Sequence, residues 1–140
     1  MPTLTLRRTR DYLRDGTSFA VETTLSSHSI PSLIRESGAQ GFSVRLIFVA
    51  PNDPEKNITR VRARADLGGH FIPDIDVRRR YSRSLANLVE AIRLSDIAEV
   101  YDNSGDEHQP VFIAKAGLVT WRKAPLPRWA EFLAILEQNT

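Results

Sequence analysis

The sequence predicts an α/β fold with three layers, in which a mostly parallel sheet lies between helices. Short apolar runs rich in β-branched and aromatic residues alternate along the chain with segments of helical periodicity. One of these runs, Ser43–Ala50, is almost continuously apolar, which is typical of a strand covered on both faces. The 140 residues show no break in composition, so we expect a single domain, residues 1–140.

The expected elements follow one another in a regular order. Gly16 is placed to stop the first helix, and Pro31 falls in the first turn of the second. The expected strands are Phe19–Leu25, Ser43–Ala50, Ile97–Tyr101 and Val111–Ala114. The expected helices are Leu4–Arg14, Ser29–Gly38, Asp53–Gly68, Pro73–Ile92 and Pro127–Leu136.

Composition excludes several classes of protein. The chain has no cysteine, so disulfides and thiolate metal sites are excluded, and its three histidines share no metal-ligand spacing. No apolar stretch approaches the length of a membrane span, so we expect no membrane contact. The basic N-terminus lacks the apolar region of a secretory signal. The sequence therefore predicts a cytoplasmic protein without a metal site of its own.

Arginine is concentrated in one part of the chain. Eight arginines and no lysine lie between Arg60 and Arg93, against four acidic residues. Arginine suits the bidentate recognition of phosphate or carboxylate. The alternative is a solvated helix face with salt bridges. Nucleic-acid binding is disfavoured, because these arginines are not interleaved with exposed aromatic residues.

Ligands of open α/β sheets bind beyond the carboxyl ends of the strands, and three segments lie there. Glu22, followed by Thr23, could accept hydrogen bonds from a substrate or act as a base; alternatively, it is a charge on an exposed strand face. Arg60 and Arg64 are four residues apart and share one helix face. Arg80 flanks the apolar stripe of the next helix, from where it could reach a cleft.

Two further features are weaker. Asn103 lies in the polar turn 102–105, where its amide could contact the edge of an adenine, although turn formation alone explains these residues. Gly68-Gly69 forms a flexible joint between the two arginine-bearing helices, as a mobile lid would need.

Taken together, these segments resemble the zeta-toxin-like proteins, a group that includes predicted ABC-type ATPases. The resemblance covers nearly the whole chain. The matching segments are the strand Phe19–Ser26, the turn Tyr101–Ser104 and a lid-like region of about residues 60–93. The lid-like region contains, in order, Arg60, Arg64, Gly68-Gly69-His70, Pro73, Arg79-Arg80-Tyr81 and Ser84–Leu88.

The resemblance implies a P-loop kinase fold, binding of ATP with Mg²⁺, and phosphoryl transfer to a small molecule. The characterised zeta toxins phosphorylate UDP-N-acetylglucosamine. By the same resemblance, Arg60, Arg64 and Arg80 would stabilise charge on the transferring phosphoryl group. Glu22 and Thr23 would hold the substrate, and Asn103 would lie near the nucleotide base.

The sequence departs from this family at its most important motif. A Walker A loop needs Gly-x-x-x-x-Gly-Lys-Ser/Thr after a strand, but no glycine in this chain is followed by lysine. We therefore expect an N-terminally truncated relative that lacks the central P-loop strand and has impaired or no catalysis. The alternative is a non-catalytic interaction module. The strands on either side of the missing one would then pair with each other or leave edges for a partner chain or a second copy.

Overall fold

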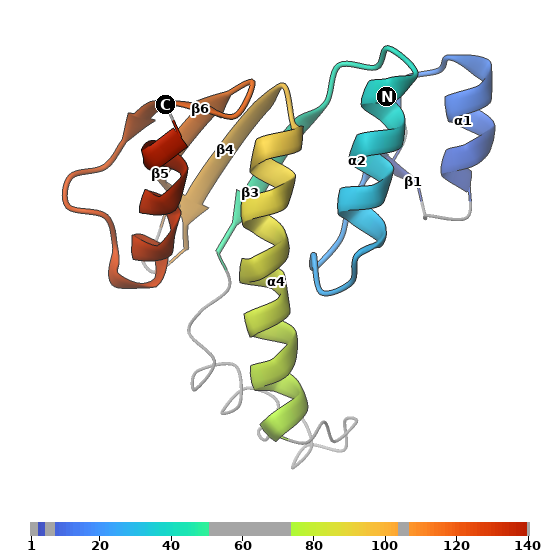
Figure 1. The fold of residues 1–140 in the computed structure, drawn as a ribbon. Coiled ribbons are helices and arrows are strands. Elements are labelled where there is room, and N and C mark those ends of the chain that lie inside the picture. Colours follow the sequence, from blue (N-terminus) through green and yellow to red (C-terminus); the bar gives the residue numbers. More distant parts are fainter. Residues whose placement is uncertain (1–2, 5–7, 51–73, 104–106, 140) are drawn as a thin grey trace.

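The computed structural model describes residues 3–4, 8–50, 74–103 and 107–139. Its strands form two sheets, a two-stranded sheet of order β1-β2 and a four-stranded sheet of order β3-β4-β5-β6 (Figure 1). The strands are β1 (Thr3–Leu4), β2 (Ala20–Val21), β3 (Arg45–Val49), β4 (Ile97–Asp102), β5 (Gln109–Lys115) and β6 (Leu118–Arg122). The helices are α1 (Thr9–Asp15), α2 (Ser29–Ala39), α4 (Asp74–Leu94) and the 3₁₀ helix η2 (Arg128–Asn139).

The larger sheet is mixed, and the expected mostly parallel sheet of the P-loop kinase type is wrong. Only β3 and β4 are parallel, whereas β5 is antiparallel to both β4 and β6. The cause is the length of the connections. Residues 103–108 join β4 to β5, and Ala116-Gly117 joins β5 to β6. A parallel pair needs a crossover of a dozen residues or more, so these short links permit antiparallel pairing only.

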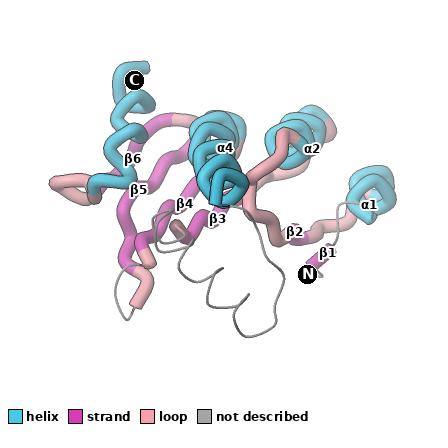
Figure 2. Tube along the Cα trace, turned by 90° about the horizontal axis from the view of Figure 1, so that it is seen from below, coloured by secondary structure: helices cyan, strands magenta, loops and turns pink. Residues whose placement is uncertain are grey.

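The helices of the larger sheet lie on one of its faces, so the expected second helical layer is also wrong for the described part of the chain. Figure 2 shows α4 and η2 on the same side of the sheet. Phe48, Val100 and Phe112 point to that side and are buried. They form one core with Leu88 and Ile92 of α4 and with residues of η2, namely Ala130, Leu133 and Leu136.

The opposite face of the larger sheet carries no helix among the described residues. In the strand register, Ile47, Glu99, Ile113 and Trp121 lie side by side, one from each strand. We call this side the uncovered face. Among the large apolar residues on it, the exposed fractions are 55% for Ile47, 37% for Val49, 53% for Leu118 and 44% for Trp121. Trp121 is therefore a surface residue of this face and not a core residue.

The strands β2 and β3 do not pair with each other. Each has a partner on one side only within the described residues, because β2 pairs with β1 and β3 pairs with β4. Figure 2 shows β2 and β1 beyond the β3 edge of the larger sheet. Of the two outcomes expected for these strands, pairing with each other is therefore wrong.

Most predicted elements are present, with corrected boundaries. α1 ends before Gly16, which adopts a left-handed conformation (φ 72°) as a helix stop. The first helix does not begin at Leu4, because Leu4 lies in a strand paired with β2. Strand β6 was not predicted, and the C-terminal helix is a 3₁₀ helix. The helix expected at Asp53–Gly68 lies outside the described residues.

Candidate functional site

The segment that joins β2 to α2, residues 22–28, packs against α4 and forms the centre of the candidate site; we call it the β2–α2 loop. Ser84 of α4 donates a hydrogen bond from Oγ to the carbonyl of Thr24 at 2.6 Å. The Nδ2 of Asn87 donates to the carbonyls of Leu25 at 2.6 Å and Ser27 at 3.0 Å. These contacts join segments about sixty residues apart in the sequence and fix the loop on the helix.

The loop is rich in hydroxyl groups and contains one unusual backbone conformation. Leu25 has φ 60°, in the left-handed region that non-glycine residues seldom occupy, and its side chain is buried. Thr23 Oγ1 accepts a hydrogen bond from the Leu25 N–H at 3.1 Å, and Thr24 Oγ1 lies 2.9 Å from Ser26 Oγ. The loop is therefore held in one shape both by its own side chains and by α4.

Two of the predicted substrate residues, Glu22 and Thr23, lie in this loop and are exposed. Arg80 lies on α4, four residues before Ser84, and is also exposed. Positions four apart share a helix face and are separated by about 6 Å along the helix axis. The structure therefore places Arg80 about one helical turn from the residue that contacts Thr24. Arg60 and Arg64 lie outside the described residues.

Asn103 follows the last residue of β4 and is exposed. Figure 1 shows the ends of β3 and β4, the β2–α2 loop and the amino-terminal half of α4 toward the same end of the molecule. Within the described residues, however, no hydrogen bond joins Asn103 to the loop or to α4. The structure therefore places Glu22 and Thr23 in a loop that is bonded to α4, the helix that carries Arg80, and leaves Asn103 on a separate strand end.

Ser84 and Asn87 are the residues of this site that the sequence prediction missed as contacts. The motif Ser84–Leu88 was noted only as part of the resemblance. Both side chains are buried, at 7% and 4% exposure, on the side of α4 that also buries Leu88 and Ala91. A polar residue within an apolar stripe needs a hydrogen-bond partner, and that rule is the signal that could have found them.

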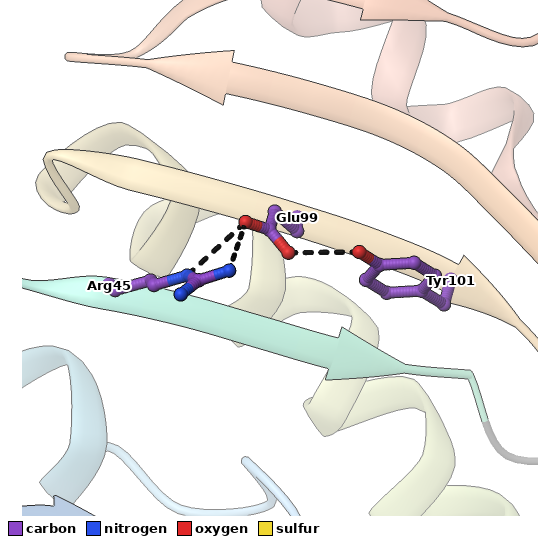
Figure 3. A network of polar contacts seen from close by, with 3 residues as sticks. All are labelled: Arg45, Glu99 and Tyr101. Carbon is purple, nitrogen blue, oxygen red and sulfur yellow. Dashed lines mark hydrogen bonds and ion pairs between the residues drawn. The ribbon is translucent and has the colours of Figure 1, made fainter. Parts of the chain in front are cut away.

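A second polar cluster lies on the uncovered face (Figure 3). Arg45 donates to Glu99 Oε1 from Nη2 at 2.7 Å and from Nε at 3.2 Å, and Tyr101 donates from its hydroxyl to Oε2 at 2.9 Å. The hydrogen bonds from Arg45, followed by that from Tyr101, lower the pKa of Glu99 below its ordinary 4.5. The same bond to Glu99 raises the pKa of Tyr101. This network satisfies the carboxylate on an otherwise largely apolar surface.

Neither a metal cluster nor a membrane-crossing helix is found in the part of the chain that the structure describes. No three His, Asp or Glu side chains gather there in a way that could hold a cation. None of the described helices has the combined length and hydropathy needed to cross a bilayer.

Comparison with known proteins gives one informative similarity. The chain is 36% identical over 69 residues to an uncharacterised protein of Haemophilus influenzae. The match covers 49% of this chain and 49% of that protein, so the chain spans about half the length of the curated relative it matches. No protein-family model and no solved structure matches the chain.

Proposed function

We propose that this chain is a zeta-toxin-like protein that binds a phosphorylated small molecule, of the sugar-nucleotide class, at the β2–α2 loop and α4. One observation carries the proposal: the hydrogen bonds from Ser84 and Asn87 tie the loop that holds Glu22 and Thr23 to the helix that holds Arg80. The residues that the sequence resemblance singles out for substrate and for phosphate thus lie on two distant segments that these bonds join, which supports the proposal.

The chemistry of the three side chains suits such a ligand. A carboxylate such as Glu22 accepts hydrogen bonds from sugar hydroxyls, and the Thr23 hydroxyl can donate or accept. The guanidinium of Arg80 can pair with two phosphate oxygens at once. A sugar nucleotide offers both kinds of group in one molecule. The proposal keeps the cytoplasmic location expected from the sequence.

The residues present do not fit ATP with Mg²⁺. The sequence contains no glycine followed by lysine, and the described residues offer no group of three His, Asp or Glu for a cation. The backbone cradle and the lysine of a Walker A loop thus have no counterpart in the sequence, and the cation ligands have none among the described residues. The proposed function is therefore ligand binding, without phosphoryl transfer by this chain alone.

Calorimetric titration of the purified chain tests the proposal. UDP-N-acetylglucosamine should give a saturable isotherm, UDP a weaker one, and N-acetylglucosamine without phosphate none, because the phosphate contact of Arg80 would be lost. ATP with Mg²⁺ should bind no more tightly than UDP. Equal binding of the sugar with and without the diphosphate would contradict the assignment of Arg80 to phosphate.

Association with a second copy of the chain is a second candidate function, favoured by the uncovered face. A two-fold axis along the strands would place β3 of one copy over β6 of the other. Ile47 would then face Trp121, and the exposed Lys115 on β5 would approach β4, which carries Glu99. This arrangement matches apolar side chains to apolar side chains, as a symmetric interface requires.

The size of the uncovered face limits the strength of this association. Strand spacings of about 4.8 Å and rises of about 3.3 Å per residue give a face of roughly 20 by 17 Å. Standard interfaces bury about 800 Å² on each partner, which is more than such a face provides. We therefore expect a weak, reversible dimer in this mode.

A further inference from the structure

We infer that Ser84 and Asn87 are positioning residues, which set the shape of the β2–α2 loop so that Glu22 and Thr23 can hold a ligand together with Arg80. The inference rests on the proposed function for the identity of the ligand. Its structural part, that two buried side chains of α4 determine the loop conformation, can be tested without any ligand.

The contacts are directed at the loop backbone. Three carbonyl acceptors of the loop, those of Thr24, Leu25 and Ser27, receive their hydrogen bonds from only two side chains. Carbonyl oxygens can only accept, so the amide of Asn87 must present its NH₂ group, and both of its hydrogens are used. A buried side chain with all its donors engaged fixes the position of its partners, because breaking either bond would leave a buried polar group unpaired.

The loop needs this support because its backbone is in an unfavourable conformation. Leu25, at φ 60°, lies between Thr24 and Ser27, whose carbonyls Ser84 and Asn87 bind, and its own carbonyl accepts the other bond from Asn87. Conformations of this kind persist only where the surroundings enforce them, and they are concentrated at functional sites. The Leu25 side chain, 2% exposed, anchors the same point in the core.

The positions of Ser84 and Asn87 on α4 couple the β2–α2 loop to Arg80. Ser84 lies one turn from Arg80 on the same helix. Glu22 and Thr23 immediately precede Thr24, whose carbonyl accepts the hydrogen bond from Ser84. An α-helix transmits such spacing rigidly. The separation of the carboxylate from the guanidinium is therefore set through Ser84 and Asn87, neither of which needs to touch the ligand.

The test compares four variants of the full chain. Ser84→Ala and Asn87→Leu remove the donors at nearly constant size, Asn87→Asp replaces the donor by an acceptor, and Ser84→Thr retains the hydroxyl. The matched control is Ile92→Val, a change in the buried part of α4 that leaves the loop contacts intact. Amide hydrogen exchange of residues 23–29 and the Kd for UDP-N-acetylglucosamine are measured for each.

We expect Asn87→Leu and Asn87→Asp to speed exchange in the loop and to raise the Kd about tenfold or more, and Ser84→Ala to do so less strongly. Ser84→Thr and Ile92→Val should bind like the wild type, even though Ile92→Val lowers the global stability. Wild-type exchange and affinity in the Asn87 variants would overturn the inference. If the wild type itself fails to bind, the proposed function fails, and loop exchange alone decides whether Ser84 and Asn87 hold the loop.

Discussion

Arg45 and Glu99 form an ion pair across the two parallel strands of the larger sheet, with Nη2 2.7 Å from Oε1. The residues are diagonal neighbours, because Arg45 is in register with Ile97 and Glu99 with Ile47. The Glu99 side chain is 17% exposed and that of Arg45 62%. The pair links the edge strand β3 to β4 from the uncovered face.

This pair predicts a pH dependence of stability. The pKa of Glu99 is lower in the folded chain than its ordinary 4.5, chiefly because of the hydrogen bonds from Arg45. As the pH falls through 4.5 toward the folded value, the unfolded chain binds more protons than the folded one, so the contribution of Glu99 to stability is progressively lost. It is fully present above this interval and amounts to at most about 1 kcal/mol.

Urea unfolding from about pH 6 to about pH 3 measures this effect. The difference in stability between the wild type and Glu99→Gln should shrink steadily as the pH falls. Tyr101→Phe, which leaves Arg45 in place, should retain most of the pH dependence. Parallel stability curves for the wild type and Glu99→Gln would contradict the assignment.

The turn between β5 and β6 predicts that two substitutions change the stability of the fold in opposite directions. Ala116 and Gly117 both have positive φ, 51° and 78°, as a type I′ turn demands. Gly117→Ala should cost about 1–2 kcal/mol, because its φ is unfavourable for any residue with a Cβ atom. Ala116→Asn should stabilise by a few tenths of a kcal/mol or more, since asparagine tolerates this conformation. Thermal unfolding of both variants checks the prediction, and a Gly117→Ala protein as stable as the wild type would disprove it.

The uncovered face predicts weak self-association that depends on Ile47. Sedimentation velocity at increasing concentration should show reversible dimers of the wild type. Ile47→Lys, at a side chain already 55% exposed, should abolish them without unfolding the monomer. Ile135→Lys is the matched control, because Ile135 is 47% exposed but lies on η2, on the other side of the sheet. A wild type that stays monomeric throughout, or an Ile47→Lys variant that still dimerises, would argue against this interface.

The sequence predicted those elements whose periodicity is strong. The stripe through Leu88 and Ile92 of α4 was found because burial on one helix face imposes a regular pattern. The strand β3 was found from its apolar run, but the covering of both faces that this run predicted is wrong, because Ile47 and Val49 are exposed. Strand β6 was missed, since Ala116-Gly117 lacks the usual Asn-Gly signal of a hairpin. The alternation of strands and helices predicts parallel pairing, whereas the antiparallel direction of β5 follows from its short connections to β4 and β6.

The candidate site could be predicted only in part. Glu22, Thr23 and Arg80 were predicted from residue type, position and the family resemblance, and the structure shows only that the two segments that carry them are bonded to each other. Ser84 and Asn87 act on carbonyls about sixty residues earlier, and backbone acceptors leave no mark in the sequence. The Arg45–Glu99 pair could not be predicted either, because it depends on the strand register, which only the folded sheet defines.

The most direct test of the central claim, that the β2–α2 loop and Arg80 form one ligand site, is the Kd for UDP-N-acetylglucosamine in a matched pair of α4 variants. Arg80→Ala should weaken binding by about tenfold to a hundredfold, as expected for a lost hydrogen-bonded phosphate contact. Arg83→Ala removes the same charge from the same helix at another exposed position and should bind within about twofold of the wild type. Equal affinities of the two variants would contradict the claim.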